Sequence, residues 1–80
     1  MNEYMVIVWA TDTPEKIFTS TARRANGARL GAVRKWAYNN GLTEVYSCSF
    51  DSPVNAKADK IRINASYQSK GYSYMPRGNI

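Results

Sequence analysis

The segment Tyr4-Met5-Val6-Ile7-Val8-Trp9-Ala10 decides the fold class of this chain. Its residues are apolar or aromatic throughout, with no polar residue alternating between them. Such a run is typical of a strand that is buried on both faces, which predicts a central place in a sheet. It is also the longest apolar run, and it is far shorter than the roughly 18–20 residues that a membrane-spanning helix needs.

The residues after this strand predict a hairpin. Thr11-Asp12-Thr13-Pro14 is a turn signal, and a second strand is expected over about residues 16–22. Three hydroxyl residues in a row, at positions 19–21, favour a strand because two of them are β-branched. Thr13-Pro14-Glu15 could instead cap a helix, so residues 13–22 stay open between strand and helix.

A helix is predicted from about Ala25 to Asn39, where apolar residues recur at helical spacing. Asn39-Asn40-Gly41 would end it with a left-handed residue. Asn26-Gly27 could alternatively be a turn, with the helix beginning at Ala28. The residues that carry the spacing are Ala25, Ala28, Leu30, Ala32, Val33, Trp36 and Ala37.

Two further segments alternate between apolar and polar residues, which predicts strands. In the first, from Val45 to Phe50, one face would carry Tyr46, Cys48 and Phe50. In the second, from Lys60 to Tyr67, the inward residues would be Ile61, Ile63, Ala65 and Tyr67, and the outward residues Lys60, Arg62, Asn64 and Ser66.

The predicted fold is α+β, with the order β-β-α-β-β. We expect a small antiparallel sheet of about four strands with one helix packed on one face and the other face partly exposed. Residues 1–68 would form a single domain. Residues 69–80 would form a basic and aromatic tail that is loose unless a partner orders it. This tail either docks on the sheet as an extra edge strand or contacts a partner.

The sequence offers no candidate residues for catalysis or for binding a metal ion. The chain has no histidine, which removes the commonest general base and the commonest transition-metal ligand. Its single cysteine, Cys48, has no histidine to activate it. Gly27 and Gly31 are not followed by the lysine and hydroxyl residue of a phosphate-binding loop. We therefore expect a non-enzymatic protein without a cofactor or a metal ion.

The charge of the chain points to a partner of opposite sign. The formal net charge is +5 and the pI is near 9.6. Such a field favours polyanions or an acidic protein surface. A lone cysteine cannot form an internal disulfide, and the N-terminal flank with Glu3 does not resemble a secretion signal. We therefore expect the protein to act in the cytoplasm, without a membrane partner.

Three surfaces are candidates for binding. Placing residues about 100° apart puts Arg24, Gly27, Gly31, Arg34, Lys35 and Tyr38 along one side of the predicted helix. If Asn26-Gly27 is a turn, Arg29 and the Arg23-Arg24 pair would instead make an anion-binding corner. The second surface is the outward face of the last predicted strand, with Lys60 and Arg62. The third is the tail, where bases and aromatics interleave as in single-strand binders: Lys70, Tyr72, Tyr74 and Arg77.

Two functions follow from these surfaces. The first is nucleic-acid binding (DNA or RNA), with the bases on phosphates and Tyr72 and Tyr74 stacking on nucleobases. The second is a small inhibitor or adaptor that docks on an acidic protein surface. The short length and the lack of catalytic motifs, rather than particular residues, suggest the kind of protein with which phages and mobile elements block host defence or nucleic-acid-handling proteins. An exposed edge strand or the glycine-lined helix side could also pair two copies into a homodimer.

Overall fold

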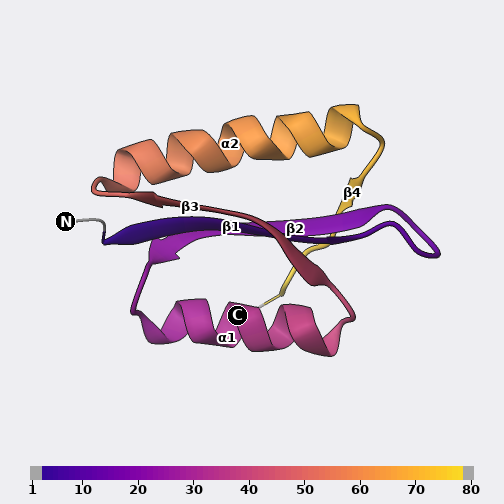
Figure 1. Ribbon diagram of the computed structural model, residues 1–80, viewed down its shortest axis with the longest axis horizontal. Coiled ribbons are helices and arrows are strands. Elements are labelled where there is room, and N and C mark those ends of the chain that lie inside the picture. The colour runs from indigo at the N-terminus through magenta and orange to yellow at the C-terminus, as the bar shows by residue number, and fades with distance from the viewer. Residues whose placement is uncertain (1–2, 79–80) are drawn as a thin grey trace.

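The computed structural model describes residues 3–78 and confirms an α+β fold. Over these residues a four-stranded sheet in the order β3-β1-β2-β4 lies between two helices. Helix α2 covers one face of the sheet and helix α1 the other (Figure 1). The prediction of a single helix on one face is therefore wrong. The observed order is β-β-α-β-α-β, and both sheet faces carry a packed layer.

The central strand is as predicted. β1 (Tyr4–Thr11) pairs antiparallel with β2 (Ile17–Arg24) on one side and with β3 (Thr43–Phe50) on the other. Val6 to Ala10 are buried because helices cover both sides of this strand. The strand alternative for residues 13–22 is confirmed over 17–22, since the hydroxyl residues at 19–21 lie buried within β2.

Helix α1 (Ala28–Asn39) begins three residues later than the predicted Ala25. Asn26-Gly27 is a turn, so the alternative start at Ala28 holds. The apolar side of the helix packs on Ile7 and Trp9 of β1 through its buried residues Leu30, Val33 and Ala37. The helix ends as predicted, because Gly41 has a φ of 76°, which only glycine adopts without strain.

Residues 60–67 are not a strand but part of helix α2 (Pro53–Ser69). Ser52 is its N-cap, with a hydroxyl that accepts a 3.4 Å hydrogen bond from the backbone N–H of Asn55, and Pro53 stands in its first turn. Ala56 and Ile63 are buried seven residues apart, whereas Ile61 is 62% exposed. The alternation of apolar residues therefore did not reflect alternating burial.

The segment after α2 folds back onto the sheet, which is the first of the two alternatives for the tail. β4 (Ser73–Tyr74) pairs parallel with β2, so the sheet is mixed rather than antiparallel. The Met75 N–H donates to the Phe18 carbonyl at 2.8 Å. The expectation of a loose segment does not hold for residues 72–75. Residues 1–2 of the predicted domain and 79–80 of the predicted tail lie outside the described residues.

Two apolar clusters hold the three layers together. Between the sheet and α1 lie Ile7, Trp9, Leu30, Val33, Ala37 and Leu42. Between the sheet and α2 lie Val8, Ala10, Phe18 and Ile63, with the rings of four tyrosines around them. Within residues 3–78, neither helix has the length and apolar character required to cross a membrane.

Candidate nucleic-acid interface

The outward side of α1 carries three basic residues along its length. Leu30, Val33 and Ala37 face the sheet, so the helical repeat turns the charged residues toward solvent. Helix α1 contains no acidic residue. Tyr38 lies beside these basic side chains, and 82% of its surface is exposed. The exposed residues of the helix are Ala28, Arg29, Gly31, Ala32, Arg34, Lys35, Tyr38 and Asn39.

The N-terminal end of α1 carries a hollow of about 260 Å³, which we call the arginine corner. Its N-cap, Gly27, offers no side-chain acceptor to the first backbone N–H groups, and the first turn holds no acid. The positive end of the helix dipole is therefore not compensated. Arg23 lines the hollow, and its Nε is buried without a hydrogen-bond partner among residues 3–78. The corner consists of Ala22, Arg23, Arg24, Gly27, Ala28, Arg29 and Leu30.

Two of the three arginines of the corner, Arg24 and Arg29, differ in whether their charge is already paired within the fold. Nη1 of Arg24 lies 3.8 Å from Oε1 of Glu3, and its Cζ lies 5.3 Å from the centroid of the Tyr4 ring. The positive charge of Arg24 is therefore partly neutralised within the fold. Arg29 is exposed and has no ion pair within the described part of the chain. An anion in the corner would meet the exposed Arg29 guanidinium together with the first backbone N–H groups of the helix.

The C-terminal half of α1 borders a larger hollow of about 580 Å³, which we call the α1 groove. Trp9 and Leu42 give it an apolar floor, and a Cβ placed on Gly31 would meet no atom within 4 Å. Arg34 lies 3.6 Å from Glu44, so the rim holds one ion pair as well as the exposed Lys35. The groove is lined by Trp9, Gly31, Arg34, Lys35, Tyr38, Leu42, Thr43 and Glu44.

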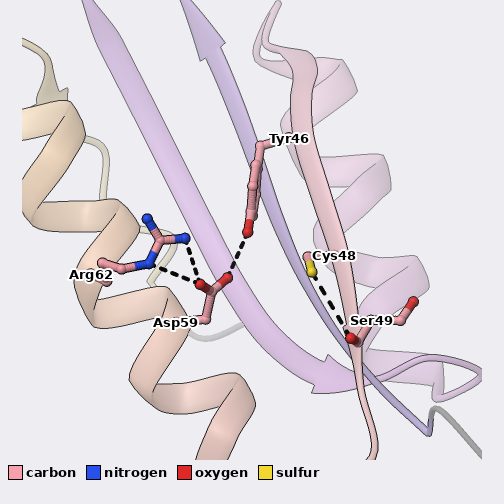
Figure 2. Close-up of polar contacts among 5 residues, drawn as sticks. All are labelled: Tyr46, Cys48, Ser49, Asp59 and Arg62. Carbon is pink, nitrogen blue, oxygen red and sulfur yellow. Dashed lines mark hydrogen bonds and ion pairs between the residues drawn. The ribbon is translucent and has the colours of Figure 1, made fainter.

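The candidate residues of the presumed last strand lie on α2, across the sheet from α1. Arg62 donates from Nε at 3.1 Å and from Nη2 at 2.6 Å to Oδ1 of Asp59. Asp59 Oδ2 accepts a 2.8 Å hydrogen bond from the Tyr46 hydroxyl of β3 (Figure 2). Burial and this bond to Asp59 raise the pKa of Tyr46 to about 12. The Arg62 guanidinium is thus already hydrogen-bonded within a contact that joins α2 to β3.

The other candidates on α2 do not form a row with Arg62, since the helix distributes them around its axis. Lys60 is half-buried. Asn64, which was expected to face outward, accepts a 2.5 Å hydrogen bond from the Ser20 hydroxyl beneath the helix. Lys70, one residue beyond the helix, lies over the Tyr67 ring at 5.3 Å.

The candidates of the tail point inward. The rings of Tyr72 and Tyr74 pack edge-on against Tyr67 and Phe18, with centroids 5.2 and 5.4 Å apart respectively. Arg77 donates from Nη1 to Thr19 Oγ1 at 2.9 Å and to the Ser20 carbonyl. These three side chains are engaged within the fold, and stacking of Tyr72 and Tyr74 on nucleobases would require them to leave it.

The structure therefore divides the candidate residues into three groups. Arg23, Arg24, Arg29, Arg34, Lys35 and Tyr38 lie together along α1 and its entrance, whereas Lys60, Arg62 and Lys70 lie with α2, and Tyr72, Tyr74 and Arg77 lie in the fold. Sequence reasoning missed Trp9, Leu42 and Glu44 as lining of the α1 groove. The position of Leu42 to Glu44 directly after the helix end was the available signal.

Comparison with known proteins gives no relative from which a function could be carried over. No protein-family model, no curated protein and no solved structure matches the chain. Function is therefore inferred from the side chains alone.

Proposed function

We propose that the protein binds nucleic acid and contacts its phosphate backbone along the outward side of α1. The observation that carries this proposal is the arginine corner, where three arginines surround a helix N-terminus that has neither a side-chain cap nor an acidic residue. Phosphate oxygens would accept hydrogen bonds from the first backbone N–H groups of α1 and would lie at the positive end of its helix dipole.

The dimensions of α1 suit a backbone contact. A helix of 12 residues is about 18 Å long, which equals about five base steps of a duplex strand. The arginine corner lies at one end of this length, and Arg34 and Lys35 lie near the other. A nucleic-acid strand that runs along the helix would thus meet basic side chains at both ends of it.

Tyr38 is the aromatic side chain in a position to stack. It is 82% exposed and borders the α1 groove beside Arg34 and Lys35. Stacking on a tyrosine does not select a base, because every base has a π-face. We therefore expect recognition of the backbone and its shape rather than of base sequence. The lone Cys48 is consistent with action in the cytoplasm, where thiols stay reduced.

The test compares two charge reversals by fluorescence anisotropy with single-stranded DNA, duplex DNA and structured RNA. Arg29→Glu with Lys35→Glu reverses two exposed bases of α1 that have no ion pair within residues 3–78. Arg34 is left unchanged because a glutamate there would face Glu44. The control, Lys57→Glu with Lys60→Glu, makes the same charge change on α2, across the sheet.

We expect the α1 variant to lose binding and the α2 variant to keep most of it. The slope of log affinity against log salt should fall by about two for the α1 variant, one for each lost phosphate contact. Equal losses in the two variants would show a diffuse charge effect, and absence of binding by the parent protein at low salt would end the proposal.

A second candidate function is docking on an acidic protein surface as an inhibitor or adaptor. The apolar floor that Trp9 and Leu42 give to the α1 groove favours it, because a groove with Tyr38 and Arg34 at its rim has the composition of a binding hot spot. A partner protein that stays bound to the immobilised chain after nuclease treatment, and is lost with Tyr38→Ala, would favour this function.

A further inference from the structure

The solvent side of α2 carries an apolar stripe that the fold does not use. Helix α2 buries Ala56 and Ile63 toward the sheet. A helix with one buried side is usually polar on the other. Here Val54 and Ile61 are 74% and 62% exposed, on the side that faces away from the sheet. The stripe consists of Val54, Ala58, Ile61 and Ala65, all exposed.

The spacing of this stripe is that of a helix-pairing seam. Its members follow one another at intervals of four, three and four residues, which keeps them on one line along the helix. The β-branched Val54 and Ile61 alternate with the alanines Ala58 and Ala65. Large side chains beside small ones present knobs and holes to a facing helix.

Positive charge borders the stripe on both sides. At about 100° per residue, Lys57 lies about 70° from the stripe on one side and Arg62 about 70° on the other. Lys57 is exposed, and the Arg62 side chain keeps 63% of its surface exposed despite its bond to Asp59. In paired helices, charged side chains at these flanking positions form salt bridges with the facing helix and so determine which partner is bound.

The charges decide between the possible occupants. The only acid on α2, Asp59, is 11% exposed and already bonded to Arg62 and Tyr46, so a second copy of α2 would offer no opposite charge. A parallel copy would also place Lys57 opposite the second copy's Arg62. We infer that the outward stripe of α2 is the docking surface for an acidic amphipathic helix of another protein.

This inference concerns the solvent side of α2, which lies across the sheet from the proposed nucleic-acid interface, so either proposal can be wrong without the other. The partner helix would place aliphatic residues on Val54 and Ile61 and glutamate or aspartate beside Lys57 and Arg62. The net charge of +5 would attract such a helix from a distance and make its association sensitive to salt.

The test uses a fluorescent designed peptide as long as α2, with leucine at the seam positions and glutamate at both flanks. The control peptide has lysine in place of each glutamate. The protein variant is Val54→Gln with Ile61→Gln, two exposed positions where glutamine leaves the helix intact, which circular dichroism checks. The matched variant is Val45→Gln, which exchanges a half-exposed valine of β3 instead.

We expect the glutamate peptide to bind the parent and the Val45 variant equally. Loss of two apolar contacts should weaken binding to the stripe variant by about tenfold or more. Nucleic-acid affinity should be unchanged in the stripe variant. Equal binding of the glutamate and lysine peptides, or binding of neither, would overturn the inference. So would self-association of the parent protein that the stripe variant abolishes, since the occupant would then be a second copy.

Discussion

The hydroxyl of Tyr46 on β3 donates a 2.8 Å hydrogen bond to Asp59 on α2, and the same carboxylate accepts two bonds from Arg62. This contact links the edge strand β3 to helix α2, which lies beside it in Figure 2. Because the neutral phenol is the donor, the contact depends on the protonation state of Tyr46.

Stability should therefore fall in alkali through Tyr46. Its pKa in the folded protein, about 12, is above the ordinary value of 10.0. The folded state thus holds the proton more tightly, so this stabilisation is complete below pH 10 and is lost as the pH rises toward 12. Tyr46→Phe should cost about 1 kcal/mol at neutral pH and make stability decline less steeply between pH 10 and 12.

Chemical unfolding at a series of pH values measures this effect. Tyr38→Phe is the control, because Tyr38 is exposed and its hydroxyl makes no hydrogen bond within the described chain. Burial also raises the pKa of Tyr67, so some alkaline decline should remain in Tyr46→Phe. A decline as steep in that variant as in the parent protein would contradict the role of Tyr46.

Arg77 should hold the C-terminal segment on the sheet. Its Nη1 donates to Thr19, to the Ser20 carbonyl and to the Tyr74 hydroxyl, and the two β2 residues are buried. Arg77→Ala leaves buried acceptors without a donor, which should cost about 2 kcal/mol. Amide exchange of Met75, whose N–H bonds to Phe18, should accelerate. Lys70→Ala serves as the surface control, and unchanged Met75 exchange in Arg77→Ala would contradict the prediction.

Alanine should have opposite effects at two glycines of α1 and its end. A Cβ at Gly31 meets no atom within 4 Å, so Gly31→Ala should stabilise the protein by about 0.5–1 kcal/mol through helix propensity. Gly41 has a φ of 76°, so Gly41→Ala should destabilise it by about 1 kcal/mol. Thermal unfolding checks both, and destabilisation by Gly31→Ala would mean that the α1 groove is narrower than described.

The sequence predicted the elements whose apolar residues mark their burial directly, as an uninterrupted run in β1 or at helical spacing in α1. β1 was recognisable because residues 6–10 are apolar toward both faces, and both faces are covered. The basic side of α1 was recognisable because its buried residues recur at helical spacing. The positions of Arg34, Lys35 and Tyr38 relative to one another follow directly from that spacing.

Helix α2 was missed because its apolar residues do not mark one buried side. Ile61 faces solvent while Ile63 is buried, and this pair imitates the alternation of a strand. The Ser52-Pro53 start was a helix signal that should have taken precedence. The places of Tyr74 and Arg77 could not be predicted at all, because their contacts with Phe18 and Thr19 join residues far apart in the chain.

The most direct test of the central claim is to map amide chemical shifts of the labelled protein as single-stranded DNA is added at low salt. Binding along α1 predicts that the perturbed amides cluster at Arg23 to Arg29 and at Arg34 to Glu44, while those of Pro53–Ser69 stay unchanged beyond the general effect of salt. Perturbations centred on α2, or absent from the arginine corner, would contradict the claim that α1 is the nucleic-acid interface.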